Sequence, residues 1–179
     1  MKTNLEIEFK TSIDKEAYNK MIEKFDLQNS IFKQTNYYFD TENNDLIKSK
    51  IVLRIRQKET QYKLTSKTHT SEGALENHLY LINDEAQEML KNGFDASKIG
   101  IKYFVKNVAT LTTYRAKTPY KGGYLFFDKS LYYGNTDYEI EYEATDKNEG
   151  IKIFEEFLRE NNIPFVKMIS KAKRAYNAK

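Results

Sequence analysis

Residues 5–10 read LEIEFK, and apolar and charged side chains alternate along them without a break. Residues 138–143 read YEIEYE and repeat the pattern near the other end of the chain. A period of two is typical of a β-strand, because successive side chains of a strand point to opposite faces of its sheet. In both segments the polar face carries glutamates two residues apart, so each strand is predicted to have one acidic face.

The same period recurs in five further segments, at residues 51–56, 61–67, 74–81, 111–117 and 124–130. Segment 51–56 places Arg54 and Arg56 on one face, and segment 61–67 places Lys63 and Lys67 on one face. About eight or nine antiparallel strands tend to curl and close, because closure removes unpaired sheet edges. We therefore expect a β-barrel.

Four other segments have the residue spacing of amphipathic helices. They are residues 13–25 after the N-cap candidate Ser12, a segment from Asn83 or Asp84 to Leu90, residues 95–104, and residues 151–160. Apolar strand faces need a partner, and helices packed outside a barrel would cover them. The fold class predicted from these patterns is α+β, as a single domain over residues 1–179.

The composition is that of a globular protein, with 40% hydrophobic and 31% charged residues in 179. The chain has no cysteine, which excludes disulfides, a thiolate nucleophile and zinc sites of the cysteine type. The 29 basic and 26 acidic residues leave a net charge of only +3, which disfavours nucleic acid as a partner. No apolar run reaches membrane-spanning or signal-peptide length, so we expect no membrane partner and a cytoplasmic location.

The charged faces of the strands have two interpretations. An antiparallel sheet often keeps one polar face in water, and this accounts for any single strand. However, whole strands carry one sign, with glutamates at positions 6 and 8 and at 139 and 141, and arginines at 54 and 56. Segregated acids and bases suit a shared cavity, in which carboxylates hold Mg²⁺ or Mn²⁺ and bases hold phosphate oxygens.

Two blocks of sequence resemble a known family. Residues 6–10, EIEFK, match an ExExK signature, while YFDT at 38–41, Leu46 and LRIR at 53–56 match a second block. Further residues follow in the family's order: Lys63, Lys67, Glu76, Arg115, Asp128, Glu139, Glu141, Ser170 and Lys171. Over essentially its whole length the chain is similar to the CYTH superfamily, the triphosphate tunnel metalloenzymes.

The resemblance implies an eight-stranded antiparallel tunnel, with helices outside, that hydrolyses a triphosphate with Mg²⁺ or Mn²⁺. The metal ligands implied are Glu6, Glu8, Asp128, Glu139 and Glu141, with Glu76 as a further acidic candidate. The substrate-binding residues implied are Lys10, Arg54, Arg56, Lys63, Lys67, Arg115, Lys171 and Arg174. Glu6, Glu8 and Lys10 are expected to act in catalysis, together with Tyr38. Either Tyr38 or its neighbour Tyr37 is expected to pair with a tunnel lysine.

Several functions remain open on the same site. Inorganic triphosphate is the leading substrate, and thiamine triphosphate, nucleoside triphosphates, longer polyphosphate and an adenylate cyclase reaction are the alternatives. A non-enzymatic binder of polyphosphate or nucleotides is disfavoured, because a pure anion binder has little use for so many carboxylates. The partner is thus expected to be a small triphosphate-containing molecule, with a monomer and a homodimer both compatible. His69 and His78 are expected to have surface or structural roles.

Overall fold

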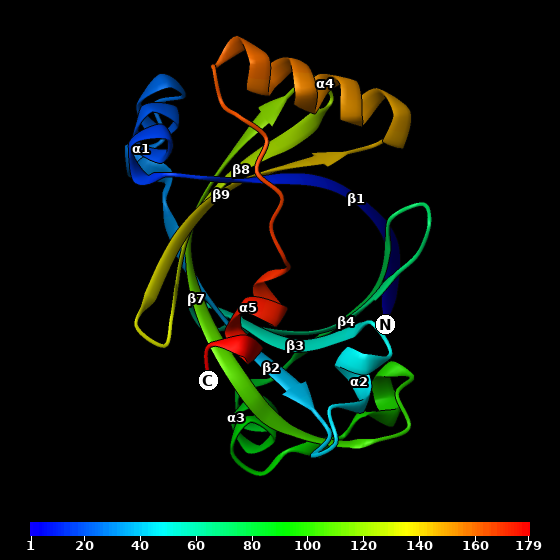
Figure 1. Cartoon of the computed structure of the whole chain (residues 1–179). Coiled ribbons are helices and arrows are strands. Elements are labelled where there is room, and N and C mark those ends of the chain that lie inside the picture. The colour runs from blue at the N-terminus through cyan, green and yellow to red at the C-terminus, as the bar shows by residue number, and fades with distance from the viewer.

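The computed structural model describes residues 1–179, and its main feature is a closed antiparallel barrel (Figure 1). Strands follow the order β2-β3-β4-β5-β1-β9-β8-β7, and pairing of β2 with β7 closes the ring. This confirms the predicted eight-stranded barrel. The strands are β1 (Lys2–Ile13), β2 (Phe32–Asp40), β3 (Ile51–Lys58), β4 (Gln61–His69), β5 (Ala74–Leu81), β7 (Phe104–Tyr120), β8 (Gly123–Tyr132) and β9 (Asn135–Ala144). The two-residue β6 (Phe94–Asp95) pairs only with β7.

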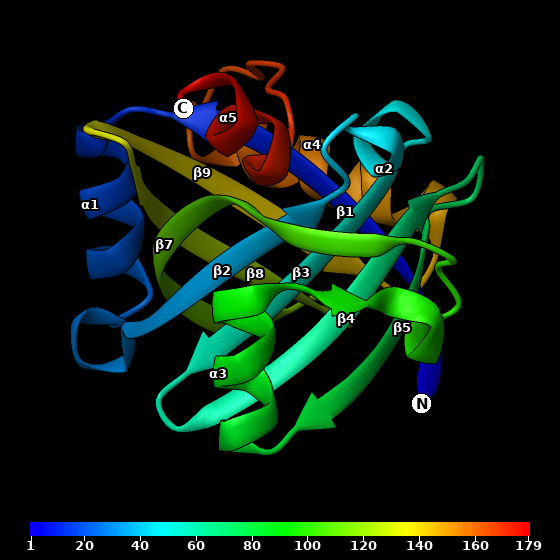
Figure 2. The ribbon, with the colours of Figure 1, turned by 90° about the horizontal axis from the view of Figure 1, so that it is seen from below.

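The helices lie outside this ring (Figures 1 and 2). Helices α1 (Lys15–Lys24) and α4 (Lys147–Glu160) pack on β1, β8 and β9. On the other flank, α2 (Asp45–Lys48) contacts β2 and β3, while α3 (Asn83–Asn92) contacts β4 and β7. The short α5 (Lys171–Asn177) contacts β7 at one end of the barrel. None of these helices is long and apolar enough to cross a membrane.

The apolar cores lie between the barrel and its helices. One core contains Phe127, Phe154 and Phe157 under α1 and α4, and another contains Leu53 and Leu64 beside α2 and α3. Because the apolar side chains of each strand point outward into these cores, the alternate polar side chains point into the lumen. The period of two thus directs the charged faces inward.

A segment from residue 161 to 170 leads from α4 to α5 and passes in front of the lumen (Figure 1). Its midpoint is held to β1, because the Ser12 amide donates to the Val166 carbonyl at 3.0 Å. The Val166 amide in turn donates to Thr11 Oγ1 at 2.8 Å. These bonds place the start of α5 against the end of the tunnel.

Two helix predictions need correction at their starts. Strand β1 runs through Ser12 to Ile13, and α1 is capped by Asp14, whose carboxylate accepts from the Ala17 amide at 2.7 Å. Helix α4 begins at Lys147 rather than at residue 151, because Asp146 caps it. Aspartate is as good an N-cap as serine, so spacing alone did not identify the caps.

Two further predictions about helices were incorrect or incomplete. Residues 95–104 were expected to be helical, but only a 3₁₀ turn at Ala96–Ile99 forms there. It ends at Gly100, whose φ of 84° is left-handed. Helix α5 was not expected at all, since its seven residues show too little apolar periodicity.

Candidate active site

Three carboxylates meet inside the barrel. Asp128 on β8 and Glu139 on β9 are direct register partners, and Glu141 lies two residues further along β9. One oxygen from each of the three lies within 4.8 Å of the others. Asp128 and Glu139 are fully buried and Glu141 is 8% exposed, so this is not the water-facing side of an ordinary sheet. Strand pairing brings Asp128 together with acids that are 11 and 13 residues further along the sequence.

Arg115 and Lys171 form salt bridges with this cluster. Arg115, the register partner of Asp128 on β7, donates to both oxygens of Asp128 at 2.7 and 2.6 Å and to Glu141 at 2.5 Å. Lys171 reaches Asp128 at 2.8 Å and Glu141 at 2.7 Å, and it also contacts Glu139. Lys171 is the first residue of α5, which Ser170 caps. Burying this many charges is tolerable only because each has an opposite partner.

Arg174 approaches the same cluster from one turn further along α5. Its guanidinium pairs with Asp137 at 2.7 Å and with Glu139. Lys173 beside it is exposed. Helical spacing therefore selects Lys171 and Arg174 as the inward-facing bases of the C-terminal basic cluster.

The pKa values of Glu139 and Glu141 are shifted in opposite directions. Burial raises the pKa of Glu139 to about 7, and Glu141 beside it adds to this effect. Burial also opposes ionisation of Glu141, but Lys171 and Arg115 hold its pKa well below the usual value. Burial alone would lower the pKa of Lys171, yet the three carboxylates hold it above its usual value.

The carboxylates of β1 form a second group in the lumen. Lys67 contacts Glu6 and lies 3.2 Å from Glu8, which is also 3.6 Å from Lys10. Burial and the neighbouring Glu8 raise the pKa of Glu6. Burial opposes ionisation of Glu8 too, but Lys67 and Lys10 lower its pKa overall. We call the five acids Glu6, Glu8, Asp128, Glu139 and Glu141, together with their basic partners, the acidic end.

The opposite opening of the tunnel has a different lining. It is a cavity of about 550 Å³, against about 70 Å³ for the cavity beside α5. Arg54, Arg56, Arg115 and Glu6 line both cavities. We call the larger cavity the basic mouth, after its bases Arg54, Arg56, Lys58, Lys63 and Lys117. Glu76, the further acidic candidate, lies in this mouth 3.6 Å from Arg54.

Tyr38 lies in the lumen beside α5 and is 1% exposed. Its hydroxyl has no hydrogen-bond partner, so no tyrosine–lysine hydrogen bond forms in this structure. Burial raises the pKa of Tyr38, while Arg54 and Lys171 oppose that rise. The expected pairing of this tyrosine with a lysine thus remains a prediction. The two histidines lie at opposite ends, His69 at the cavity beside α5 and His78 in the basic mouth.

Some lumen residues escaped the sequence analysis. Gln34 and Asn36 share the inward face of β2 with Tyr38, and Arg56 donates to Asn36 Oδ1 at 2.8 Å. Phe126 also lines the basic mouth, where the Arg115 guanidinium carbon lies 4.4 Å from its ring centroid. The period of two through Gln34, Asn36 and Tyr38 could have identified the amides. Asp40, by contrast, is structural and accepts from the Thr41, Leu46 and Ile47 amides.

The donor set of the buried triad fits a hard divalent cation. Ligand oxygens at about 2.1 Å from one Mg²⁺ lie at most about 4.2 Å apart, close to the spread of these three carboxylates. All of the donors are oxygens, which suit Mg²⁺ or Mn²⁺. The arrangement can therefore hold a cation and, on adjacent strands, an anion.

Comparison with known proteins finds relatives along the whole chain. YjbK of Bacillus subtilis strain 168, named as a candidate triphosphatase, is 33% identical over 190 residues, covering 100% of this chain and 98% of YjbK. A crystal structure from Bacillus halodurans, named as a candidate adenylate cyclase, is 33% identical with a TM-score of 0.89, covering 97% of this chain and 98% of that one. HpAC1 from Hippeastrum, described as a candidate adenylyl cyclase with a dominant triphosphatase activity, shares the fold at 23% identity and a TM-score of 0.76, covering 97% of this chain and 96% of its own.

A family model agrees with these relatives. The model of the CYTH domain matches residues 4–176, which include every strand that lines the lumen except the first two residues of β1. The chain belongs to the CYTH family.

Proposed function

We propose that this protein is a divalent-metal-dependent hydrolase of triphosphates, with inorganic triphosphate as its substrate. One observation carries the proposal: a buried carboxylate triad and a set of buried bases line the same tunnel. A triphosphate with a bridging cation needs both kinds of group at once. The candidate triphosphatase YjbK, related along its full length, supports the same assignment.

The roles of the residues follow from their positions. Asp128, Glu139 and Glu141 would hold one cation, and Glu6 and Glu8 would contribute to a second site. Such a cation supplies Lewis-acid chemistry, since it offsets phosphate charge and lowers the pKa of water. The protein's own part is to orient the phosphate chain and to donate hydrogen bonds to its oxygens.

The bases divide into two groups by their present partners. Lys10, Lys67, Arg115, Lys171 and Arg174 pair with carboxylates, whereas Arg56 and Lys63 form no salt bridge. The unpaired bases are available to phosphate oxygens at once. Those that are paired become available as a cation takes their carboxylates. The lumen can therefore hold both a cation and a phosphate chain, and binding of the cation favours binding of the phosphate chain.

A second candidate reaction, adenylate cyclase chemistry, is favoured by the name given to the Bacillus halodurans relative. In that reaction the ribose 3′-oxygen of ATP attacks the α-phosphorus in place of water, and pyrophosphate leaves. The structure places no bare aromatic face beside the acidic end to hold a base, because the small cavity there is lined mainly by charged side chains. Hydrolysis is therefore the first choice.

The test compares products from inorganic triphosphate, ATP and thiamine triphosphate with Mg²⁺ or Mn²⁺. The Glu6→Gln/Glu8→Gln variant keeps the side-chain shape but removes two carboxylate charges. Its control is Glu155→Gln/Glu160→Gln, which removes two exposed charges from α4. We expect phosphate release from inorganic triphosphate that only the first variant abolishes. Cyclic AMP and pyrophosphate from ATP would establish the cyclase instead, and no product from any substrate would refute both reactions.

A further inference from the structure

The two bases that α5 turns toward the acidic end differ in their contacts. Lys171 lines the cavity beside α5, and its ammonium contacts all three carboxylates of the buried triad, at 2.8 Å for Asp128 and 2.7 Å for Glu141. Arg174 lines neither of the two tunnel cavities, and Glu139 is the only member of the triad that it contacts. A cation bound by all three carboxylates must therefore take the place of Lys171, but it need not displace Arg174.

Arg174 divides its guanidinium between two carboxylates of β9. One terminal nitrogen contacts Glu139 Oε2, and the other lies 2.7 Å from Asp137 Oδ1. Lys171 contacts the other oxygen of Glu139, Oε1. The two bases of α5 thus hold different oxygens of this carboxylate. Once Lys171 leaves, Oε1 is free to bind a cation while Arg174 still holds Oε2.

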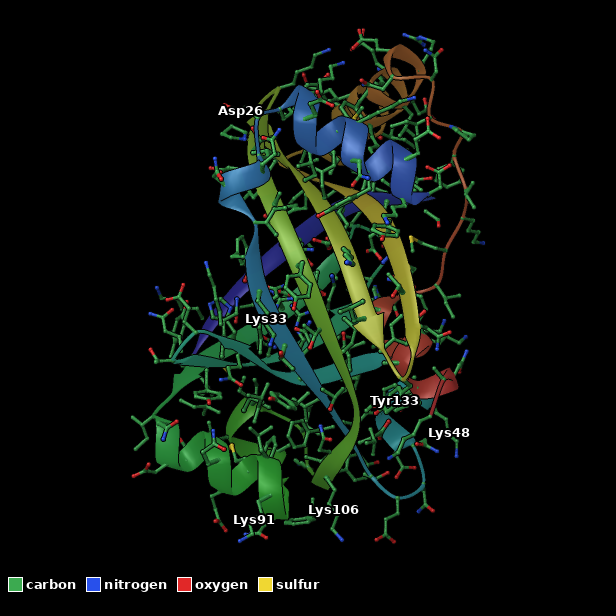
Figure 3. The ribbon with its side chains drawn as sticks, turned by 90° about the vertical axis from the view of Figure 1, so that its left-hand side faces the viewer. Asp26, Lys33, Lys48, Lys91, Lys106 and Tyr133 are labelled. Atoms are coloured by element: carbon green, nitrogen blue, oxygen red, sulfur yellow. The ribbon has the colours of Figure 1, made fainter.

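Asp137 is itself held at its second oxygen. Its Oδ2 accepts a hydrogen bond from the Tyr132 hydroxyl at 2.6 Å, and Tyr132 packs against the apolar cluster beneath α5. Burial and this hydrogen bond raise the pKa of Tyr132 to about 12, so the hydroxyl keeps its proton and donates at neutral pH. Figure 3 shows α5 beside the end of the hairpin between β8 and β9, where Tyr133 is labelled. This chain of contacts joins the hairpin to α5.

Asp137 gives Arg174 a partner that a cation at the triad would not remove. Arg174 is only 9% exposed, and a buried guanidinium that lost its acid would cost the folded state free energy. The charge of Asp137 also offsets that of Arg174, which would otherwise repel a cation on Glu139. Metal-binding carboxylates are commonly oriented by outer partners of this kind.

We propose that Asp137 and Arg174 are a positioning pair, which fixes Glu139 for cation binding without contact between Arg174 and the phosphates. The proposal rests on the proposed function, which places a cation at the triad. Arg174 then has a different role from the substrate binding expected from the sequence. Of the two inward-facing bases of α5, only Lys171 is released to a phosphate chain, because Asp137 retains Arg174.

The test measures, by isothermal titration calorimetry, the dissociation constants of Mn²⁺ alone and of inorganic triphosphate without metal. Asp137→Asn removes the charge that retains Arg174, and Arg174→Lys keeps a positive charge but loses the fork that contacts two carboxylates. We expect each variant to bind Mn²⁺ about tenfold more weakly than wild type. The double variant should lose no more than either single variant, because the two residues act as one unit. Arg174→Met should weaken triphosphate binding less than Lys63→Met does.

Glu143→Gln is the matched control for Asp137→Asn, because it removes another half-buried carboxylate from the inward face of β9. Its Mn²⁺ affinity should fall less than about threefold. An equal loss in this control, or additive losses in the double variant, would overturn the positioning pair, because Asp137 would then act through its charge alone. Triphosphate binding weakened as much by Arg174→Met as by Lys63→Met would also overturn it, since Arg174 would then bind phosphate.

The two titrations require no turnover, and circular dichroism confirms that each variant is folded. The expected Mn²⁺ affinities in a protein that releases no phosphate would therefore refute the hydrolase but support the positioning pair. A wild type that binds no Mn²⁺ would overturn the pair together with the metal dependence of the proposed function.

Discussion

The acidic end and the basic mouth are built from the same alternating strands but treat their charges in opposite ways. At the acidic end, the fully buried Asp128 and Glu139 contact Arg115, Lys171 and Arg174. In the mouth, Arg56 and Lys63 have no acid within salt-bridge distance. One end has its electrostatic partners supplied by the fold, and the other keeps unpaired donors that a ligand can satisfy.

The difference shows that charges in one tunnel have different roles, depending on whether they form salt bridges within the protein. Paired charges hold α5 and β9 together, and a cation must replace a base to enter there. Unpaired charges cost the folded state free energy and return it when an anion binds. Stability is thus expected to depend on the acidic end, and anion affinity on the mouth.

The largest expected effect distinguishes the two ends by activity. Asp128→Asn keeps the side-chain shape but removes a charge that Arg115 and Lys171 contact. We expect triphosphate hydrolysis to fall about 1000-fold, or about 4 kcal/mol in the activation barrier. Glu143→Gln at the mouth should change it less than about threefold. Steady-state phosphate release with Mg²⁺ or Mn²⁺ gives both values, and equal losses would contradict the division into two ends.

The next effect concerns stability. Lys171→Met leaves three carboxylates at the acidic end short of one base, and we expect the free energy of unfolding to fall by about 3 kcal/mol. Lys173→Met removes the same charge from the exposed side of α5 and should cost less than about 0.5 kcal/mol. Urea denaturation measures both. Added Mg²⁺ should stabilise Lys171→Met more than wild type, and the absence of this difference would count against cation binding at the triad.

A smaller effect of opposite sign is expected in the mouth. Lys63→Met removes a half-buried charge that lies among arginines, so the free energy of unfolding should rise by about 1 kcal/mol. The same variant should bind inorganic triphosphate more weakly than wild type does. Urea denaturation measures the change in stability, and calorimetry measures the change in affinity. A loss of stability would show that Lys63 already has a stabilising partner.

The smallest effect is a dependence on pH. Burial, with Arg56 and Arg54, lowers the pKa of Lys63 below its ordinary 10.5, so the folded protein releases this proton earlier than the unfolded chain. Stability should therefore rise slightly as the pH increases toward 10.5, since the unfolded state holds more protons there. The affinity for inorganic triphosphate should fall over the same range, because Lys63 loses its charge. In Lys63→Met both trends should be reduced, which denaturation and titration at several pH values can check.

Much of the barrel could be predicted because its signal is local. The alternation in residues 5–10 and 138–143 requires only that each side chain point opposite to the last, and the structure confirms those strands. Helix ends were less predictable, since Ser12 and Asp14 are both good caps and only the length of β1 selects between them. Helix α5 was not predicted, because its buried side chains include Lys171 and Arg174, which contact acids. Such contacts leave no apolar period in the sequence.

The sequence by itself determined which side chains of each strand share a face, since the strand period is a property of the local backbone. Only the tertiary structure decided which faces meet. The register of β8 with β9 joins Asp128 to Glu139, and closure through β2 and β7 brings Gln34 and Asn36 into the lumen. Strand register and barrel closure depend on contacts between distant segments. The separation of paired from unpaired charge at the two ends is therefore a property of the fold.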